Sequence, residues 1–384
     1  MYKRILSSRL KETFSKFPAI SVTGPRQSGK TTLVRETFPD LNYVNLEDPS
    51  LRLTVKEDPK GFLDRYTEGL IIDEAQHLPE LFSYLQIYID ERNKPAQYII
   101  TGSQQFLMNE RISQSLAGRV AIFRLLPLSY QEIKDDNIDT DEYIFRGFYP
   151  KLYNFDINPS DFYASYVSTY VERDVRTLAQ VTDLGLFQKF LMLCAGRAGQ
   201  ELNVVSIAND CGIDRRTAQK WLSVLEASYI IHFLKPYYTN FNKQIIKSPK
   251  LYFYDTGLLS YLLRITSKEQ IATHYAMGAL FENLVVNEYI KNFFNNNIHV
   301  NLYYIRNKNG QEIDLMIDGA IQDLIEIKAS KTFNPNFVNN IEYWKPYFDK
   351  PLSYVIYNGE NTSFKNSFVL NWKDIIYSKD TKSS

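Results

Sequence analysis

A glycine-rich segment near the N-terminus has the residue types that cradle a phosphate. It fits the pattern G-x-x-x-x-G-K-[ST] at every fixed position and lies between an apolar run and a helical run. Glycines let backbone N–H groups wrap an anion, and the following helix N-terminus adds favourable partial charge. Lys30 is expected to contact the β- and γ-phosphates of ATP, and the Thr31 hydroxyl to ligate Mg²⁺. The alternative is a glycine turn without a ligand. The predicted nucleotide-binding residues are Gly24, Pro25, Arg26, Gln27, Ser28, Gly29, Lys30, Thr31 and Thr32.

Two carboxylates follow a second apolar run and complete this chemistry. Asp73 and Glu74 end the segment Gly-Leu-Ile-Ile-Asp-Glu, and Ser103 follows the next apolar run. The C-terminal edge of a parallel sheet is where α/β proteins bind ligands. We predict that Asp73 holds the Mg²⁺ shell, that Glu74 deprotonates the attacking water and that Ser103 lies near the γ-phosphate. A solvated Asp-Glu pair and an ordinary Gly-Ser turn are the alternatives.

These motifs together resemble a known family. GPRQSGKTT, LIIDEAQ, IITGSQQF and Ser115-Leu-Ala-Gly-Arg119 are similar to bacterial and archaeal AAA-type ATPases, related to signalling-type P-loop ATPases, that carry an uncharacterised C-terminal domain. The similarity continues through Tyr170-Val-Glu-Arg-Asp174, Tyr252-Phe-Tyr-Asp255-Thr-Gly257 and Gly278-Ala-Leu-Phe-Glu282. The resemblance implies ATP binding and hydrolysis, with ATP and Mg²⁺ as cofactors.

Phosphoryl transfer also needs an arginine, supplied by the same chain or by a neighbouring subunit. The candidates are Arg119, Arg146, Arg173 and Arg176. We favour Arg119, because it follows an expected helix and precedes the last strand of the ATPase core. A surface charge is the alternative for each of them.

The segment 201–250 has the pattern of a helix-turn-helix with a two-stranded wing. Its second helix is expected to begin near Asp214 and to expose Arg215, Arg216, Gln219 and Lys220. The wing carries lysines interleaved with aromatic residues, namely Lys235, Lys243, Lys247 and Lys250 with Tyr237, Tyr238 and Phe241. Seven basic and four acidic residues make the segment net +3, which favours phosphate contact with DNA. Packing against the ATPase is the alternative.

A third group of chemistry-bearing residues lies near the C-terminus. Glu282 falls on an expected helix, Asp314 on a strand, and Glu326 and Lys328 on one face of the next strand. This order resembles the PD-(D/E)XK nucleases, with Glu-Ile-Asp where Pro-Asp gives the motif its name. The resemblance implies a metal site at Glu282, Asp314 and Glu326, with Lys328 steadying water or leaving charge. A nuclease-like fold without activity is the alternative.

These residues need a mixed α/β protein to position them. Strands expected at residues 19–23, 43–46, 69–73, 98–102 and 120–125 alternate with helices, which predicts a parallel sheet covered on both faces. We predict an AAA-type P-loop core over 1–126, a helical lid or linker over 127–198, a winged helix over 199–263 and a PD-(D/E)XK-like α/β domain over 264–384.

Composition limits the remaining choices. The 384 residues carry 44 basic and 44 acidic side chains, which excludes a basic coat over the whole chain, although residues 270–330 are net −3. Two cysteines offer no disulfide framework, and no apolar stretch reaches membrane-spanning length. We therefore expect a cytoplasmic protein without membrane contact, and homo-oligomers fit this class. The alternative functions are a nucleotide-switched signalling or binding protein with an inactive nuclease-like domain, and a small-molecule kinase.

Overall fold

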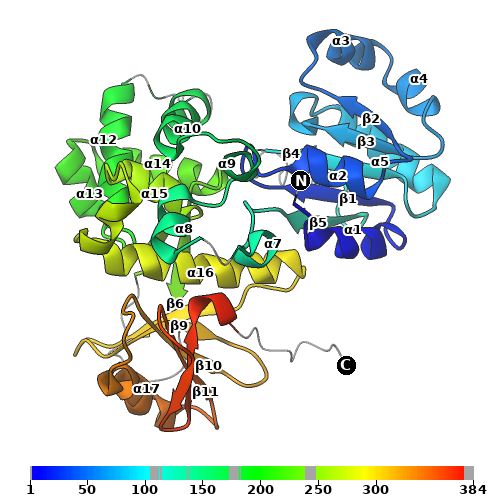
Figure 1. Ribbon diagram of the computed structural model, residues 1–384. Coiled ribbons are helices and arrows are strands. Elements are labelled where there is room, and N and C mark those ends of the chain that lie inside the picture. The colour runs from blue at the N-terminus through cyan, green and yellow to red at the C-terminus, as the bar shows by residue number, and fades with distance from the viewer. Residues whose placement is uncertain are drawn as a thin grey trace.

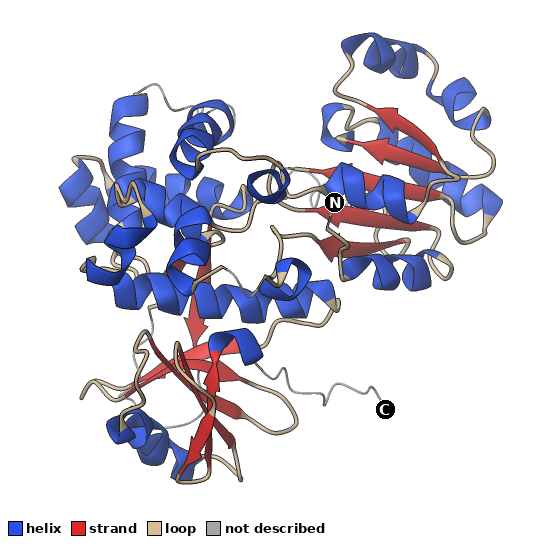
Figure 2. Ribbon diagram, viewed as in Figure 1, coloured by secondary structure: helices blue, strands red, loops and turns tan. Residues whose placement is uncertain are grey.

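The computed structural model describes residues 2–103, 112, 115–135, 138–172, 181, 183–237 and 248–375. Figure 1 shows three parts: a sheet flanked by helices at the N-terminal side, a helical unit beside it, and a second sheet below, with the long helix α16 between the helical unit and the second sheet. Figure 2 shows the strands gathered in the first and last parts, while the helical unit is drawn mostly as helices.

The N-terminal part is a five-stranded parallel sheet in the order β2-β3-β4-β1-β5. The five strands predicted from the apolar runs are all present, with ends that differ by at most one residue. Its elements are α1 (Leu6–Phe14), β1 (Ala19–Thr23), α2 (Lys30–Thr37), β2 (Asn42–Asn45), α3 (Pro49–Glu57), α4 (Pro59–Asp64), β3 (Leu70–Asp73), α5 (Leu81–Arg92), β4 (Tyr98–Gly102) and β5 (Val120–Arg124).

Helices cover both faces of this sheet, as predicted. Alternate residues along each strand point to opposite faces, so neighbours such as Ile71 and Ile72 enter different cores. Helices α1 and α2 pack on the face that contains Ile71, and α3, α4 and α5 pack on the face that contains Ile72. All five residues of β1 and all four of β3 are buried, as expected of central parallel strands, and their polar members Ser21, Thr23 and Asp73 are buried with the apolar ones.

A buried carboxylate, that of Asp255, joins several helices of the helical unit. Its Oδ1 accepts hydrogen bonds from the Tyr163 hydroxyl at 2.6 Å and the Leu258 N–H at 2.9 Å, and its Oδ2 accepts one from the Phe148 N–H at 2.8 Å. A Cβ on Gly257 would lie 2.4 Å from the Tyr163 hydroxyl oxygen. The Asp255-Thr-Gly257 motif is therefore a packing joint between helices. The elements here are α7 (Tyr130–Ile133), α8 (Thr140–Arg146), α9 (Pro150–Asn154), α10 (Pro159–Tyr166), the π-helix η2 (Val167–Val171), α12 (Leu184–Ala195), α13 (Val204–Cys211), α14 (Arg215–Ala227) and α15 (Thr256–Leu262).

A helix-turn-helix geometry is present in α13 and α14. Gly212 ends α13 in the left-handed region at φ 82°, and the Asp214 side chain caps α14 by accepting a hydrogen bond from the Thr217 N–H at 2.9 Å. The side chains expected to face outward on α14 are exposed: Arg215, Arg216, Gln219 and Lys220.

The following strands β6 (Ile231–Pro236) and β7 (Lys250–Phe253) pair antiparallel, but they do not form a free-standing wing. Strand β6 also pairs in parallel with β8, so both strands belong to the C-terminal sheet. The predicted wing residues Tyr238, Phe241, Lys243 and Lys247 lie outside the described residues.

The C-terminal sheet has the order β12-β13-β11-β10-β9-β8-β6-β7. Strands β8, β9 and β10 form an antiparallel meander, α17 follows, and β11 returns parallel to β10. Its elements are α16 (Met277–Asn295), β8 (Leu302–Arg306), β9 (Glu312–Ile317), β10 (Asp323–Lys328), α17 (Asn339–Trp344), β11 (Leu352–Tyr357), β12 (Thr362–Phe364) and β13 (Ser367–Asn371).

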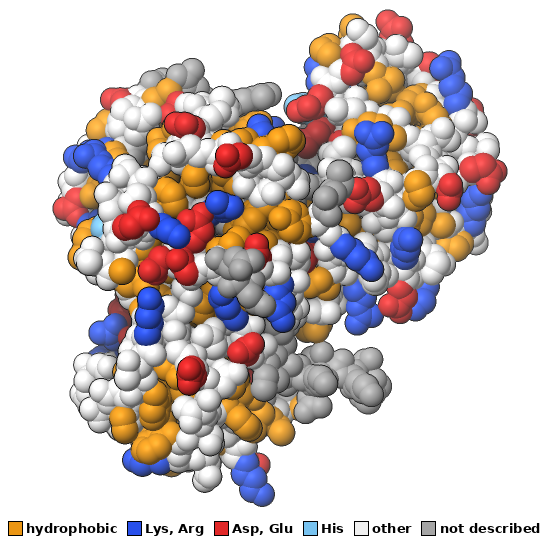
Figure 3. Space-filling model, viewed as in Figure 1, with side chains coloured by type: hydrophobic (Ala, Val, Ile, Leu, Met, Phe, Trp, Pro, Cys, Tyr) orange, Lys and Arg blue, Asp and Glu red, His pale blue; other side chains and the backbone are white. Residues whose placement is uncertain are grey.

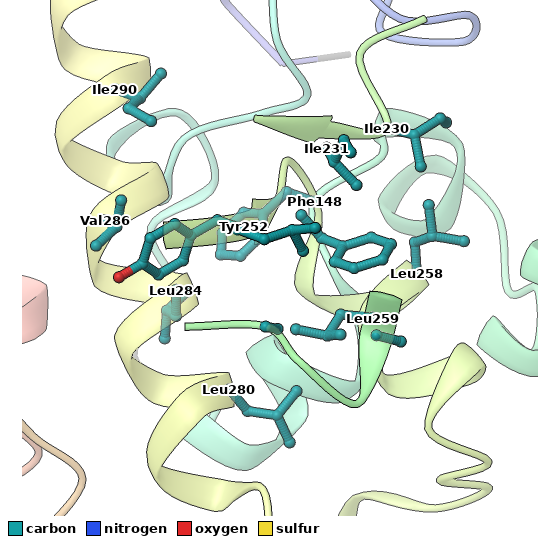
Figure 4. Close-up of a cluster of buried hydrophobic side chains, with 14 of the residues drawn as sticks. Phe148, Ile230, Ile231, Tyr252, Leu258, Leu259, Leu280, Leu284, Val286 and Ile290 are labelled. Atoms are coloured by element: carbon teal, nitrogen blue, oxygen red, sulfur yellow. The ribbon is translucent and has the colours of Figure 1, made fainter. Parts of the chain in front are cut away.

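Helix α16 packs between the helical unit and the C-terminal sheet and contributes to a core that both share. Figure 4 shows Leu280, Leu284, Val286 and Ile290 on this helix, with the Tyr252 hydroxyl turned toward it. One continuous apolar cluster runs from residue 126 to residue 375 and crosses the predicted boundaries at 198/199 and 263/264, which stay predictions. Among the described residues, none of the helices combines the length and apolar character needed to cross a membrane.

Candidate functional site

The phosphate-binding loop connects β1 to α2 and depends on glycine at both ends. A Cβ on Gly24 would lie 2.1 Å from the backbone oxygen of Leu125, and Gly29 adopts φ 91° just before α2. A side chain at either position would clash or strain the backbone. The loop therefore holds backbone N–H groups at the start of α2, where an anion is favoured.

Lys30 is poised over this loop. Its side chain is 5% exposed, and its Nζ donates hydrogen bonds to the backbone oxygens of Gly24 at 3.0 Å and Pro25 at 2.8 Å. Burial lowers the pKa of Lys30, against the opposing effect of the Glu74 and Asp73 carboxylates. An incoming phosphate would restore the counter-charge that this buried ammonium lacks.

Asp73 collects hydroxyl donors from three other elements. Its Oδ2 accepts hydrogen bonds from Thr31 and Tyr43, each at 2.7 Å, and its Oδ1 accepts one from Thr101. The sequence predicted Thr31 and Asp73 as partners, and the structure brings them together. Tyr43 and Thr101 were missed, because strand order rather than local sequence places them there. Burial and the hydrogen bond to Asp73 raise the pKa of Tyr43 above its usual range.

Glu74 lies just beyond β3 in the left-handed region at φ 52°. Its Oε2 accepts hydrogen bonds from the Ser103 hydroxyl at 3.0 Å and from the Gln76 amide. Glu74 and Ser103, which were each predicted to lie at the nucleotide, are therefore in contact, and Gln76 is a third member that sequence reasoning missed. Ligand atoms of Glu47, Glu74 and His77 also lie within 4.8 Å of one another.

Other predicted loop residues serve the joint with the helical unit. The Gln27 amide donates to the Tyr170 hydroxyl at 3.0 Å, and the Arg26 guanidinium lies 5.4 Å from the centre of the Tyr170 ring. The Thr23 hydroxyl lies 2.9 Å from that of Tyr229. Figure 3 shows a hollow between the N-terminal part and the helical unit. Of the remaining predicted residues, Ser28 is buried and Thr32 is exposed.

Arg4 also supports the loop, although no sequence signal marked it. Its guanidinium donates to the backbone oxygens of Ser28 at 2.8 Å and Leu126 at 2.7 Å, and it pairs with Glu132 at 3.0 Å. The N-terminal segment is thereby fixed to the phosphate-binding loop.

Arg119 does not lie at its own chain's phosphate loop. It precedes β5, where its backbone oxygen accepts a hydrogen bond from the N–H of Ala19, at the opposite end of β1 from Gly24. Its side chain pairs with Asp90 at 2.6 Å. Arg119 therefore does not reach the loop of its own chain, because a parallel strand puts the residue before it at the far edge; its predicted role, supplied from a neighbouring subunit, stays a prediction. Of the other candidates, Arg146 pairs with Glu142, and Arg173 and Arg176 lie outside the described residues.

The C-terminal sheet assembles a second cluster of charged side chains. Lys328 bridges Asp314 at 3.2 Å and Glu326 Oε2 at 2.5 Å, and the Ile327 N–H donates to Asp314 Oδ2 at 2.8 Å. Glu326 is fully buried, and its Oε1 has no hydrogen-bond partner among the described residues. Burial raises the pKa of Glu326 well above its usual range; for Asp314, burial is outweighed by Lys328 and Lys250, which hold its pKa low.

Glu282 joins this cluster from α16 through two partners that sequence reasoning missed. The Lys250 Nζ lies 2.9 Å from Glu282 Oε1 and also pairs with Glu312, and the Tyr252 hydroxyl donates to Glu282 Oε1 at 2.5 Å. Burial and the nearby Asp314 raise the pKa of Glu282. Lys250 was predicted to face DNA from a wing. That prediction is wrong, because its side chain is 3% exposed and points into the carboxylates.

Three family models match consecutive parts of the chain. Residues 16–134 match an AAA domain, residues 137–269 a domain of unknown function (DUF8612), and residues 277–375 another domain of unknown function (DUF4143). The predicted AAA-type module is therefore confirmed, and it supports ATP binding at the loop described above. Neither of the other two descriptions names a winged helix or a nuclease.

The curated relatives span most of the chain. Uncharacterized proteins of Mycobacterium tuberculosis and Mycobacterium bovis are each 29% identical over 336 residues, which is 86% of this chain and 74% of each relative. Among solved structures, a Walker-type ATPase of Pyrococcus abyssi is 14% identical, with a TM-score of 0.46 over 67% of this chain and 94% of that one. The Holliday junction branch migration motor of Thermotoga maritima is 13% identical, with a TM-score of 0.31 over 59% of this chain and 86% of that one. At these TM-scores the structural likeness decides nothing further.

Proposed function

We propose that this chain is a Mg²⁺-dependent ATPase in which Glu74 activates the attacking water. The observation that carries the proposal is the set of side chains gathered at one edge of the parallel sheet. Lys30 lies over the loop, Thr31 bonds Asp73 at 2.7 Å, and Ser103 bonds Glu74 at 3.0 Å. Glu74 is held beside Thr31 and Asp73, the proposed Mg²⁺ ligands, and can accept a proton from water there.

The residues present fit a magnesium ion. Asp73 and Thr31 offer oxygen ligands, which Mg²⁺ prefers, and their oxygens are already in contact. When bound, Mg²⁺ supplies neutralising charge for the phosphate oxygens. Tyr43 and Thr101 keep Asp73 oriented toward Thr31, and Lys30 adds the second positive charge.

An arginine from a neighbouring copy completes the proposed ATPase site. Arg119 lies at the far edge of the sheet, where its guanidinium pairs with the exposed Asp90 and donates to the backbone oxygen of Ala117. That position suits a residue supplied in trans within a homo-oligomer.

A second proposed function is metal-dependent cleavage of a phosphodiester at the C-terminal cluster. The specific observation is that α16, β9 and β10 bring Glu282, Asp314 and Glu326 together, with Lys328 among them. The buried Glu326 Oε1, which has no hydrogen-bond partner in the described part of the chain, is the kind of oxygen that a divalent cation satisfies. A bound cation would supply Lewis acidity, and Lys328 would stabilise charge on the attacking or leaving oxygen. This is the role of the PD-(D/E)XK arrangement.

DNA is the proposed partner of the helix-turn-helix. The exposed Arg215, Arg216 and Lys220 lie on one helix, α14, beginning at its first residue. The face drawn in Figure 3 mixes Lys and Arg with Asp and Glu and shows no broad basic stripe. Contact through α14 is therefore expected to be local, to go mainly to phosphates and to weaken with salt.

Turnover of ATP by the full chain, with and without duplex DNA, tests the link between these parts. We expect DNA to stimulate turnover at low salt and Arg215→Ala/Arg216→Ala to remove the stimulation without changing the basal rate. Arg264→Ala, a basic side chain exposed on another element, is the control and should behave as wild type. Turnover that ignores DNA would favour the nucleotide-switched binding protein instead.

Nicking of supercoiled DNA in the presence of Mg²⁺ or Mn²⁺ tests the second function. We expect cleavage by the wild type and its loss in Asp314→Asn and Lys328→Ala, because both remove charge from the cluster. Glu342→Gln, which changes an exposed carboxylate on α17, should cleave normally. Gel shifts without metal-dependent nicking would identify an inactive nuclease-like domain that only binds.

A further inference from the structure

A buried lysine lies inside the carboxylate cluster, where no part of the proposed mechanism requires it. Lys250 is the first residue of β7, and its Nζ pairs with Glu282 Oε1 at 2.9 Å and with Glu312. The strand that carries it follows the helix-turn-helix, so the ammonium enters the C-terminal cluster from a preceding part of the chain.

The carboxylates on the two sides of the cluster, Glu282 and Glu326, differ in their hydrogen-bond partners. Glu282 Oε1 already receives donors from both Lys250 and Tyr252, so one oxygen of this carboxylate is taken and a positive charge lies beside it. On the other side, Glu326 Oε1 is buried and has no hydrogen-bond partner among the described residues. The cluster is therefore charge-paired at Glu282 and incomplete at Glu326.

The charges of the cluster indicate what is missing. The connected ion pairs hold five carboxylates, those of Glu201, Glu282, Glu312, Asp314 and Glu326, and three cationic groups, those of Lys250, Arg306 and Lys328. Two negative charges remain, which one divalent cation would balance. A cation bound at Glu282 would meet the Lys250 ammonium at close range, where burial strengthens the repulsion between like charges.

The backbone holds Lys250 in this place. The N–H of the next residue, Leu251, donates to the Gln200 oxygen at 3.1 Å, and the Leu251 oxygen accepts from the Gly199 N–H at 2.7 Å. Gly199 has φ +74°, and a Cβ there would lie 3.7 Å from Glu282 Oε2. The backbone at the start of β7 is thus fixed beside Glu282 by the segment before α13, and the ion pairs with Glu282 and Glu312 hold the Lys250 side chain in the cluster.

We propose that Lys250 is a resident cation that takes the place of a divalent metal at Glu282 and weakens, without abolishing, metal binding by the wild-type chain. The inference rests on the proposed metal site and adds its regulation: Glu282 becomes a metal ligand only when the Lys250 charge is withdrawn. Asp314 and Glu326 alone then form a weak cation site in the wild type.

Isothermal titration calorimetry of the nucleotide-free full chain with Mn²⁺ tests this inference. We expect Lys250→Met to bind Mn²⁺ at least about tenfold more tightly than the wild type. Lys250→Gln, which keeps a donor for Glu282 but not the charge, should show the same direction and serves if the methionine variant does not fold. Lys250→Arg keeps the charge and should match the wild type, as should Lys235→Met, an exposed lysine on the neighbouring strand β6.

The gain in affinity should disappear in Lys250→Met/Asp314→Asn. Folded Lys250→Met and Lys250→Gln variants that still bind ATP, but bind Mn²⁺ no more tightly than the wild type, would overturn the inference. A gain that survives Asp314→Asn would overturn it too, because the metal would then lie elsewhere. Absence of DNA nicking beside a clear Mn²⁺ gain would reject the proposed cleavage alone and leave the role of Lys250 standing.

Discussion

Glu74→Gln is expected to lower ATP turnover by about 10²- to 10⁴-fold while leaving ATP affinity near that of the wild type. The glutamine keeps the size of the side chain and can still hydrogen-bond Ser103 and Gln76, which now contact Glu74 Oε2. It cannot accept the proton of the attacking water. The loss should therefore appear in kcat, measured by phosphate release, and not in nucleotide affinity measured by titration.

Lys30→Ala should differ from Glu74→Gln, and the difference separates phosphate binding by Lys30 from water activation by Glu74. Removing the ammonium that lies over Gly24 and Pro25 takes away a direct phosphate contact, so affinity and turnover are expected to fall together. Glu80→Gln, an exposed carboxylate six residues after Glu74, is the matched control and should turn over ATP normally. A Glu74→Gln variant within threefold of the wild-type rate would assign the water-activating role to another group.

Local sequence determined the parts of the nucleotide site that lie next to each other along the chain. The loop from Gly24 to Lys30 and the strand ending in Asp73 were predictable, because glycine spacing and an apolar run specify a loop and a buried strand without help from elsewhere. The same reasoning predicted the alternation of buried strands and covering helices.

Contacts set by strand order could not be predicted in this way. Tyr43 and Thr101 reach Asp73 because β2 and β4 flank β3, an order that no short motif encodes. Lys250 was placed on a wing by its basic neighbours in sequence, yet β7 carries it into the carboxylates. Arg119 was favoured from its place before a strand, and the direction of that strand puts it at the edge far from the loop of its own chain, so only the supply from a neighbouring subunit stays as a prediction.

Helix α16 connects the two candidate sites through a buried ion pair. Glu288 and Lys291 are each 1% exposed, and Glu288 Oε1 lies 2.8 Å from the Lys291 Nζ. Glu288 Oε2 accepts the N–H of Tyr130 at 2.8 Å, and the Lys291 Nζ lies 3.6 Å from the centre of the Phe148 ring. The helix that presents Glu282 is therefore fixed, two turns later, to the segment that leaves the AAA domain.

Lys291→Met is expected to destabilise this joint by about 3–5 kcal/mol, because it leaves the Glu288 carboxylate buried beside a single N–H donor. Glu288→Gln should also destabilise the joint, since this change leaves the Lys291 ammonium buried without its counter-charge. The double variant Glu288→Gln/Lys291→Met keeps an acceptor for Tyr130 and buries no charge, so it should cost less than Lys291→Met alone.

Urea unfolding followed by tryptophan fluorescence measures this difference, since all three tryptophans, Trp221, Trp344 and Trp372, lie after the AAA domain. Trp372 reports the joint directly, because its ring centre lies 5.0 Å from that of Tyr130. Lys308→Met, at an exposed turn, should stay within about 0.5 kcal/mol of the wild type. Additive losses in the double variant would show that the two charges act independently, and the ion pair would then not be what holds α16 to the AAA domain.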